Sequence, residues 1–113
     1  MTGFDLYIEE GRRALEALSN PVEIGRKVKK IVLKTWPNAK VYLFGSSVKG
    51  KYTASSDIDI LIVVDNVSYE EALRFKAQVY MELDYPLEIH VVTPKQFTDW
   101  YMRFIEEDEI LEI

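Results

Sequence analysis

The chain has 113 residues, a net charge of −5 at pH 7 and a pI near 4.9, which predict one globular domain over residues 1–113 and argue against direct binding to nucleic acid. The absence of cysteine excludes disulfides and thiolate zinc sites, and the single histidine, His90, excludes a multi-histidine zinc site within one chain. No apolar run reaches the roughly 20 residues needed to cross a bilayer, and the N-terminus lacks a signal-peptide pattern, so we expect no membrane segment and a cytoplasmic location.

Two helices are predicted ahead of the first strand. Apolar residues recur among charges in a helical pattern over residues 5–18, although Gly11 weakens that pattern. Asn20 precedes a proline, which is a signal for the start of a helix, and Glu23 would complete an N-x-x-E capping box with it. The second helix is therefore expected over residues 21–35, with Asn20 as its N-cap.

Three strands are predicted after these helices. The run KVYLFG at residues 40–45 is β-branched and aromatic, and the run IDILIVV at residues 58–64 is apolar enough for a central strand buried on both faces. A third strand is expected at residues 87–93, with sequence LEIHVVT. Residues 46–56, between the first two strands, are expected to form a loop or one short helical turn.

Two more helices complete the prediction. Ser68 and Glu71 form a capping box that opens a helix through about residue 83, and Thr93 with Gln96 opens a final helix in the same way. Helices that alternate with strands in this order predict an α/β (α+β) fold, a small mixed sheet of three to four strands with helices mainly on one face. The pattern leaves open which strand pairs are parallel.

Two aspartates mark a candidate metal site at the start of the second strand. Asp57 and Asp59 are two residues apart, so in a strand their side chains would emerge on the same face. Carboxylates held this close repel each other unless a cation lies between them, and Mg²⁺ prefers oxygen ligands together with substrate phosphates. The segment therefore predicts a site for metal and phosphate.

A glycine-rich loop precedes the aspartates and must be compared with a P-loop. Gly45 and Ser46 follow a strand directly, where backbone N–H groups and a hydroxyl can face a phosphate. Residues 45–51 read G-x-x-x-x-G-K, but Tyr52 stands where a P-loop needs Ser or Thr for Mg²⁺. The following segment also leads to a strand and not to a long helix, so we reject the P-loop.

Residues 45–59 resemble instead the signature of the nucleotidyltransferase superfamily that includes DNA polymerase beta and kanamycin nucleotidyltransferase. The pattern G-S-x-x-x-G-x-x-x-x-x-S-D-x-D is met at every position. The chain is most similar to the minimal nucleotidyltransferases, single small domains that keep this catalytic core and little else. The resemblance implies the nucleotidyltransferase fold over nearly the whole chain after the first helix.

The resemblance also implies roles for the residues of this signature. Gly45 and Ser46 would contact the triphosphate of ATP, while Asp57 and Asp59 would hold two Mg²⁺ ions that act on the α-phosphate and the leaving pyrophosphate. Ser56 would support the aspartates by hydrogen bonding.

A third carboxylate on a neighbouring strand completes the site in this family. Glu88 is our choice, because it is an acid in the middle of an otherwise apolar strand. His90 shares its face and is the alternative, either as a metal ligand or as a proton acceptor. Lys49 could steer the triphosphate, although family members often have arginine there and lysine offers only a point charge.

The resemblance implies an enzyme that transfers a nucleotidyl group, AMP from ATP, to an acceptor hydroxyl. Minimal nucleotidyltransferases are commonly paired with a HEPN-domain protein, so the implied acceptor is a tyrosine of a HEPN toxin and the implied role is that of an antitoxin. An alternative, favoured by the ambiguous third acid, is a catalytically impaired module that binds and inhibits or scaffolds a partner. A small-molecule transferase of the aminoglycoside type would need a second domain for its acceptor.

Overall fold

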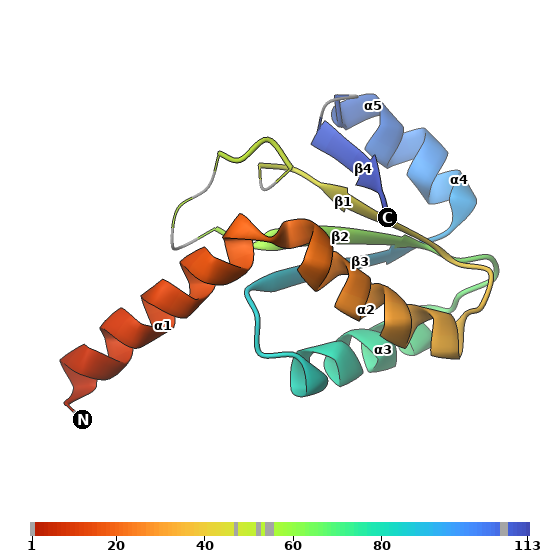
Figure 1. The fold of residues 1–113 in the computed structure, drawn as a ribbon. Helices are drawn as coiled ribbons and strands as arrows, with labels where there is room; N and C mark the ends of the chain where they lie inside the picture. Colours follow the sequence, from red (N-terminus) through yellow and green to blue (C-terminus); the bar gives the residue numbers. More distant parts are fainter. Residues whose placement is uncertain (1, 47, 52, 54–55, 107–108) are drawn as a thin grey trace.

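The computed structural model describes residues 2–46, 48–51, 53, 56–106 and 109–113. Tyr52, on which part of the P-loop comparison rests, lies outside these ranges, but the strand expected after the loop is present. The elements, in chain order, are α1 (Gly3–Ser19), α2 (Pro21–Thr35), β1 (Lys40–Phe44), β2 (Ile58–Val63), α3 (Tyr69–Glu82), β3 (Leu87–Val92), α4 (Pro94–Gln96), the π-helical turn η1 (Phe97–Tyr101), α5 (Met102–Phe104) and β4 (Ile110–Glu112) (Figure 1).

The four strands form one mixed sheet in the order β3-β2-β1-β4. Strand β1 runs antiparallel to both β2 and β4, whereas β2 and β3 are parallel and α3 forms the crossover between them. The predicted α/β fold with a mixed sheet is confirmed. Strand β2 has a strand on each side, as its continuous apolar sequence indicates.

One face of the sheet carries the main core, because alternate side chains of each strand point to it. Helices α2 and α3 cover this face (Figure 1). The fully buried residues of this core include, from the sheet and both helices, Val41, Leu43, Ile58, Ile60, Ile62, Val28, Val32 and Val79. The two long helices on this face agree with the expectation that helices lie mainly on one side.

The C-terminal helical segment, α4 to α5, lies against the opposite face of the sheet (Figure 1). Leu61, Val63 and Val92 are buried there, and the ring of Tyr42 stacks on Phe97 with their centroids 5.0 Å apart. The residues that the segment buries most completely lie near the C-terminal end of β2 and β3. Side chains near the start of β2 and β3 on this face are therefore left for a functional site.

Asn20 is the N-cap residue of α2 and Pro21 begins the helix, as predicted, but the side-chain cap expected of Asn20 does not form. Asn20 makes no side-chain cap hydrogen bond, because its backbone (φ −129°, ψ 56°) is occupied in ending α1, where its N–H donates to the Ala17 carbonyl oxygen. The capping boxes at Ser68 and Thr93 form as predicted. Strand β4 was not predicted, because three residues in an acidic segment give no periodic pattern.

The molecule measures 47 × 29 × 20 Å, and helix α1 projects from the rest of it (Figure 1). Along its 17 residues only Ala17 and Leu18, at its C-terminal end, are buried. Within the described ranges, no helix is long and apolar enough to span a membrane.

Candidate active site

The parallel pairing of β2 with β3 brings the predicted acids together. Asp59 lies directly opposite Glu88 in the register, and His90 follows two residues later on the same face of β3. One ligand atom from each of these three side chains lies within 4.8 Å of the others. The sequence left Glu88 and His90 as alternatives, and the fold places both beside Asp59.

The surroundings of the Asp59 carboxyl group disfavour its charged form. Burial, a hydrogen bond with Glu88 and the negative charges of Glu88 and Asp57 together raise the pKa of Asp59 to about 7. Two carboxylates at this distance favour either a shared proton or a bound cation. The donor set of two carboxylates and one imidazole fits a divalent metal ion, since a cation would remove the repulsion that now favours the proton.

His90 is held in place by aromatic side chains. Its ring packs against Phe44 and Tyr101, with centroids 5.2 and 5.9 Å away, and its Nδ1 lies 3.4 Å from the Tyr101 hydroxyl. Its Nε2 lies 3.6 Å from Glu88 Oε1. Burial lowers the pKa of His90 despite the opposing effect of the Glu88 charge, so the ring is neutral at pH 7. A neutral imidazole beside a carboxylate can donate to it, or can ligate a metal.

Gly45 directly follows β1 and lies against the Asp59 carboxylate. Its φ of +83° favours glycine, and a Cβ at this position would lie 2.7 Å from Asp59 Oδ2. The Gly45 N–H donates to the Glu109 carbonyl oxygen at 2.9 Å. The glycine therefore permits close approach of the loop to the acid cluster, a function that its motif alone did not reveal.

The loop after Gly45 begins with the predicted phosphate contact, Ser46, which is exposed. The hydroxyl of Ser56, the residue before Asp57, accepts a hydrogen bond from the Thr53 N–H at 2.9 Å. Asp57 is exposed just before β2 and lies outside the group of three ligands, although its charge contributes to the raised pKa of Asp59.

Lys49, the predicted triphosphate-steering residue, is paired with acids from the C-terminal segment. Its Nζ lies 3.1 Å from Glu109 Oε1 and 3.7 Å from Glu106 Oε2. The sequence shows that this segment is acidic, but only the antiparallel addition of β4 to β1 brings it to the loop. A phosphate that approached Lys49 would compete with these carboxylates.

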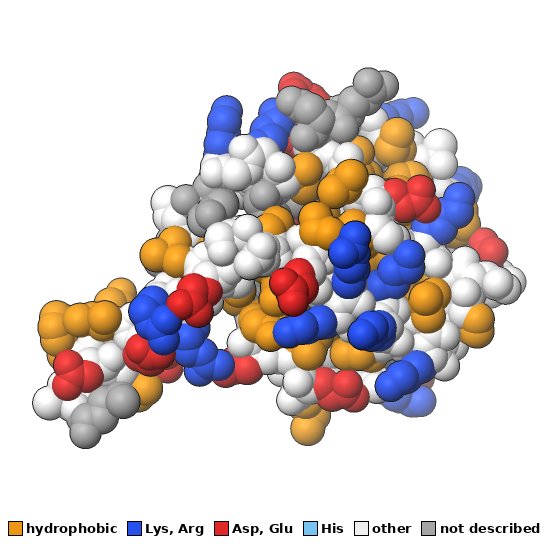
Figure 2. Space-filling model, in the orientation of Figure 1, with side chains coloured by type: hydrophobic (Ala, Val, Ile, Leu, Met, Phe, Trp, Pro, Cys, Tyr) orange, Lys and Arg blue, Asp and Glu red, His pale blue; other side chains and the backbone are white. Residues whose placement is uncertain are grey.

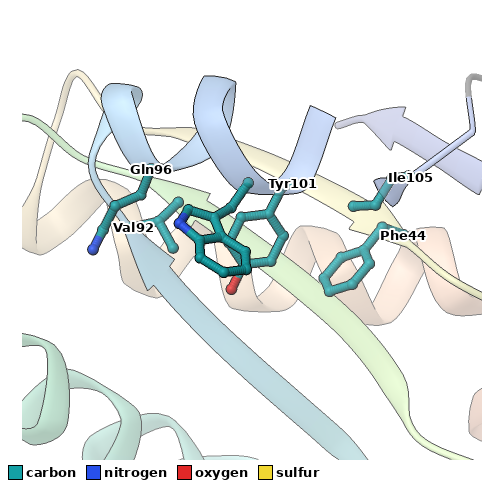
Figure 3. Close-up of a pocket in the computed structure, with 6 residues that line it drawn as sticks. Phe44, Val92, Gln96, Tyr101 and Ile105 are labelled. Atoms are coloured by element: carbon teal, nitrogen blue, oxygen red, sulfur yellow. The ribbon is translucent and has the colours of Figure 1, made fainter. Parts of the chain in front are cut away.

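An aromatic pocket of about 430 Å³ adjoins the acid cluster (Figure 3). Its lining residues come from β1, β3 and the C-terminal helical segment: Phe44, Val92, Gln96, Trp100, Tyr101 and Ile105. Phe44 and Tyr101 also contact His90, so the pocket and the cluster share a wall. Sequence reasoning missed the pocket, because aromatic residues at helical spacing usually indicate core packing.

Comparisons with known proteins identify relatives over most of the chain. A family model for the nucleotidyltransferase domain matches residues 26–113. A Methanocaldococcus jannaschii protein named "putative protein adenylyltransferase" is 34% identical over 98 residues, which cover 85% of this chain and 98% of that protein.

Two solved structures have a similar fold. One, described as a putative nucleotidyltransferase, is 32% identical with a TM-score of 0.63, and the match covers 78% of this chain and 95% of the other. The second, from Sulfolobus solfataricus, is 21% identical with a TM-score of 0.59 and covers 88% of this chain and 85% of the other. The second match is a likeness of fold alone.

Proposed function

The chain belongs to the nucleotidyltransferase domain family, and on that premise we propose that it transfers AMP from ATP to an acceptor hydroxyl, with Mg²⁺ at the acid cluster. The observation that supports this most strongly is the register that sets Asp59 opposite Glu88. Gly45 leaves room for the loop directly beside them. Such a cluster, next to a loop of small residues, suits a polyphosphate that arrives with its cations.

Asp59 and Glu88 would hold the metal ions, with Asp57 at the exposed edge of the cluster. When bound, two divalent ions supply charge neutralisation for the entering and leaving oxygens of an in-line displacement. His90, fixed between its aromatic neighbours, would be a further ligand beside the Glu88 carboxylate. Neutral at pH 7, it adds no positive charge that would repel a cation.

Phosphate binding is assigned to the loop after β1. Ser46 is exposed and offers a hydroxyl, and Lys49 would exchange its carboxylate partners for phosphate oxygens as the triphosphate arrives. The aromatic pocket accommodates a planar ring beside the cluster. A substrate could thus place its ring in the pocket and its reacting group at the carboxylates.

For the acceptor we propose a tyrosine hydroxyl of a HEPN-domain partner, which makes this chain an antitoxin. The resemblance to minimal nucleotidyltransferases supports this, as does the name of the M. jannaschii relative, which specifies protein as its substrate. The open position of Asp57 also suits an acceptor that is carried on another macromolecule.

The test is transfer of label from α-labelled ATP with Mg²⁺ to a HEPN protein encoded beside this chain. Asp59→Asn should abolish transfer, whereas Asp65→Asn, an exposed aspartate beyond the other end of β2, should leave it intact. Transfer that continued unchanged in Asp59→Asn would exclude this mechanism.

A second candidate function is a non-catalytic module that binds a partner. The pairing of Lys49 with Glu106 and Glu109 favours it, since a lysine already neutralised attracts a triphosphate less. Calorimetric titration with ATP and Mg²⁺ separates the two functions. An enzyme must bind both, while a protein that holds its partner tightly without binding either would be the module.

A further inference from the structure

The projecting helix α1 carries an exposed apolar stripe, which we define as Phe4, Ile8, Gly11 and Leu15. Spacings of four, three and four residues place these positions on one face of a helix. The three large side chains are 72%, 53% and 43% exposed. Figure 2 shows hydrophobic side chains gathered at the far end of α1. A continuous exposed apolar stripe on a projecting helix indicates an interface with another molecule.

The rest of the molecule does not cover the stripe. Arg13 ties α1 to the loop before β3 through a 3.1 Å hydrogen bond from its Nη2 to Asp84 Oδ2, and a groove between α1 and the body is lined in part by Arg13 and Ala17. At about 100° per residue, Arg13 and Ala17 lie roughly opposite the stripe on the helix. Leu18, one turn beyond Leu15 on the same side of the helix, is fully buried, so the body covers this side at the C-terminal end of α1 and leaves the stripe itself exposed.

No contact in the described part of the chain explains why residue 11 is a glycine. It lies in the middle of a helix, where glycine is the least favourable residue after proline. A Cβ at this position would meet no atom of the described chain within 4 Å, so packing does not require glycine either. Close approach of another backbone or of a large side chain to this face would require it.

We propose that the α1 stripe is covered by α1 of a second copy of this chain, in an antiparallel pair. The positions 4, 8, 11 and 15 have the same spacing read from either end. An antiparallel pair therefore sets Ile8 of each copy into the notch at Gly11 of the other, and Phe4 against Leu15. A parallel pair would set Gly11 against Gly11 and leave a gap at the centre.

The edge of the helix beside the stripe carries Asp5, Glu9, Arg12 and Glu16. An antiparallel pair brings each Asp5 near Arg12 of the other copy, and it also sets Glu9 near Glu9, a like-charge contact that Arg12, bonded to Glu9 within each chain, reduces. Glu9 and Glu16 of the same helix hold the Arg12 side chain. The family match begins at residue 26, beyond α1, so this surface and the proposed function are independent.

The first test is the mass of the full chain in solution by light scattering, with two matched variants. The wild-type chain should be a dimer, and Ile8→Glu should weaken it at least about tenfold, equivalent to 1.4 kcal/mol. Leu6→Glu is the control, because Leu6 is 50% exposed on the same helix but lies away from the stripe. It should leave the dimer intact. A monomeric wild type, or a dimer that survives Ile8→Glu, would overturn the proposal.

The second test fixes the geometry and uses the absence of cysteine from the chain. A mixture of Phe4→Cys and Leu15→Cys chains should form a disulfide-linked pair on mild oxidation. Neither variant alone should cross-link, since like positions lie about 16 Å apart along the axis of an antiparallel pair. Cross-linking of Phe4→Cys to itself would contradict the antiparallel arrangement. Gly11→Ala should make α1 more helical yet weaken the dimer, and a strengthened dimer would remove the role assigned to the notch.

Discussion

Replacement of Asp59 by asparagine should stabilise the metal-free protein while it destroys the proposed site. The pKa of Asp59 is raised to about 7 in the folded state from an ordinary value of 3.8, so the folded chain holds a proton that the unfolded chain has released between these pH values. The free energy of unfolding therefore falls as pH rises through this window, and the whole destabilisation by the ionised Asp59 is present above pH 7. The pKa difference corresponds to about 4 kcal/mol, which we reduce to about 1–2 kcal/mol because the carboxyl is only half-buried.

Asparagine is neutral at every pH and can donate to Glu88 as protonated Asp59 does. In urea unfolding with a chelator present, the free energy of unfolding of Asp59→Asn should exceed that of the wild type by about 1–2 kcal/mol near pH 8. This gain in stability should shrink toward zero near pH 4. Asp65→Asn, which removes an exposed charge beyond the other end of β2, controls for net charge and should show no such pH-dependent gain. A variant less stable than the wild type near pH 8, or a gain independent of pH, would refute the electrostatic reasoning.

Three further predictions concern the same cluster. Gly45→Ala should lower the free energy of unfolding by about 2 kcal/mol or more, and Gly50→Ala by only about 1 kcal/mol. Both glycines have positive φ, but only at Gly45 would a Cβ be pushed against Asp59. Equal losses in urea unfolding would show that this contact is unimportant. Because burial lowers the pKa of His90, acidification below about pH 6.5 should destabilise the wild type more than His90→Gln, and parallel pH profiles of stability would contradict this. Mg²⁺ at a hundred times its Kd should stabilise the wild type by about 2.7 kcal/mol in thermal unfolding and should lose this effect in Asp59→Asn; an equal effect on both would place the ion elsewhere.

Local signals in the sequence predict most of the fold. The capping boxes at Ser68 and Thr93 form because each side chain and its partner lie within one helical turn, and the apolar run of β2 reflects its central place. Asn20 is the N-cap residue of α2, but its side chain makes no cap hydrogen bond, because the same residue also ends α1 and a pattern for one helix does not include the other. Strand β4 forms by pairing with β1, which is far away in the sequence, and the three residues of β4 give no sign of that pairing.

The candidate site is likewise predictable from the sequence only in part. Spacing alone predicts Asp57 and Asp59 on one face, but whether Glu88 or His90 joins them depends on the register of β2 with β3, which the sequence left open. The 2.7 Å approach at Gly45 and the pairing of Lys49 with Glu109 are also contacts between separate segments. Motifs thus identify the chemical groups, while the distances between them come from strand pairing.

The arrangement of the cluster bears on which acceptors it could serve. Asp57 is exposed, and the adjoining pocket is bordered by Trp100, whose side chain is 65% exposed. A small-molecule acceptor must find walls that hold its hydroxyl in line with the reacting phosphate, since misplacement by about 1 Å costs on the order of a hundredfold in rate. A protein acceptor brings its own walls and can cover the exposed carboxylate as it docks. The open edge therefore favours a protein hydroxyl over a free small molecule, and equal transfer to a folded HEPN protein and to free tyrosine would contradict that preference.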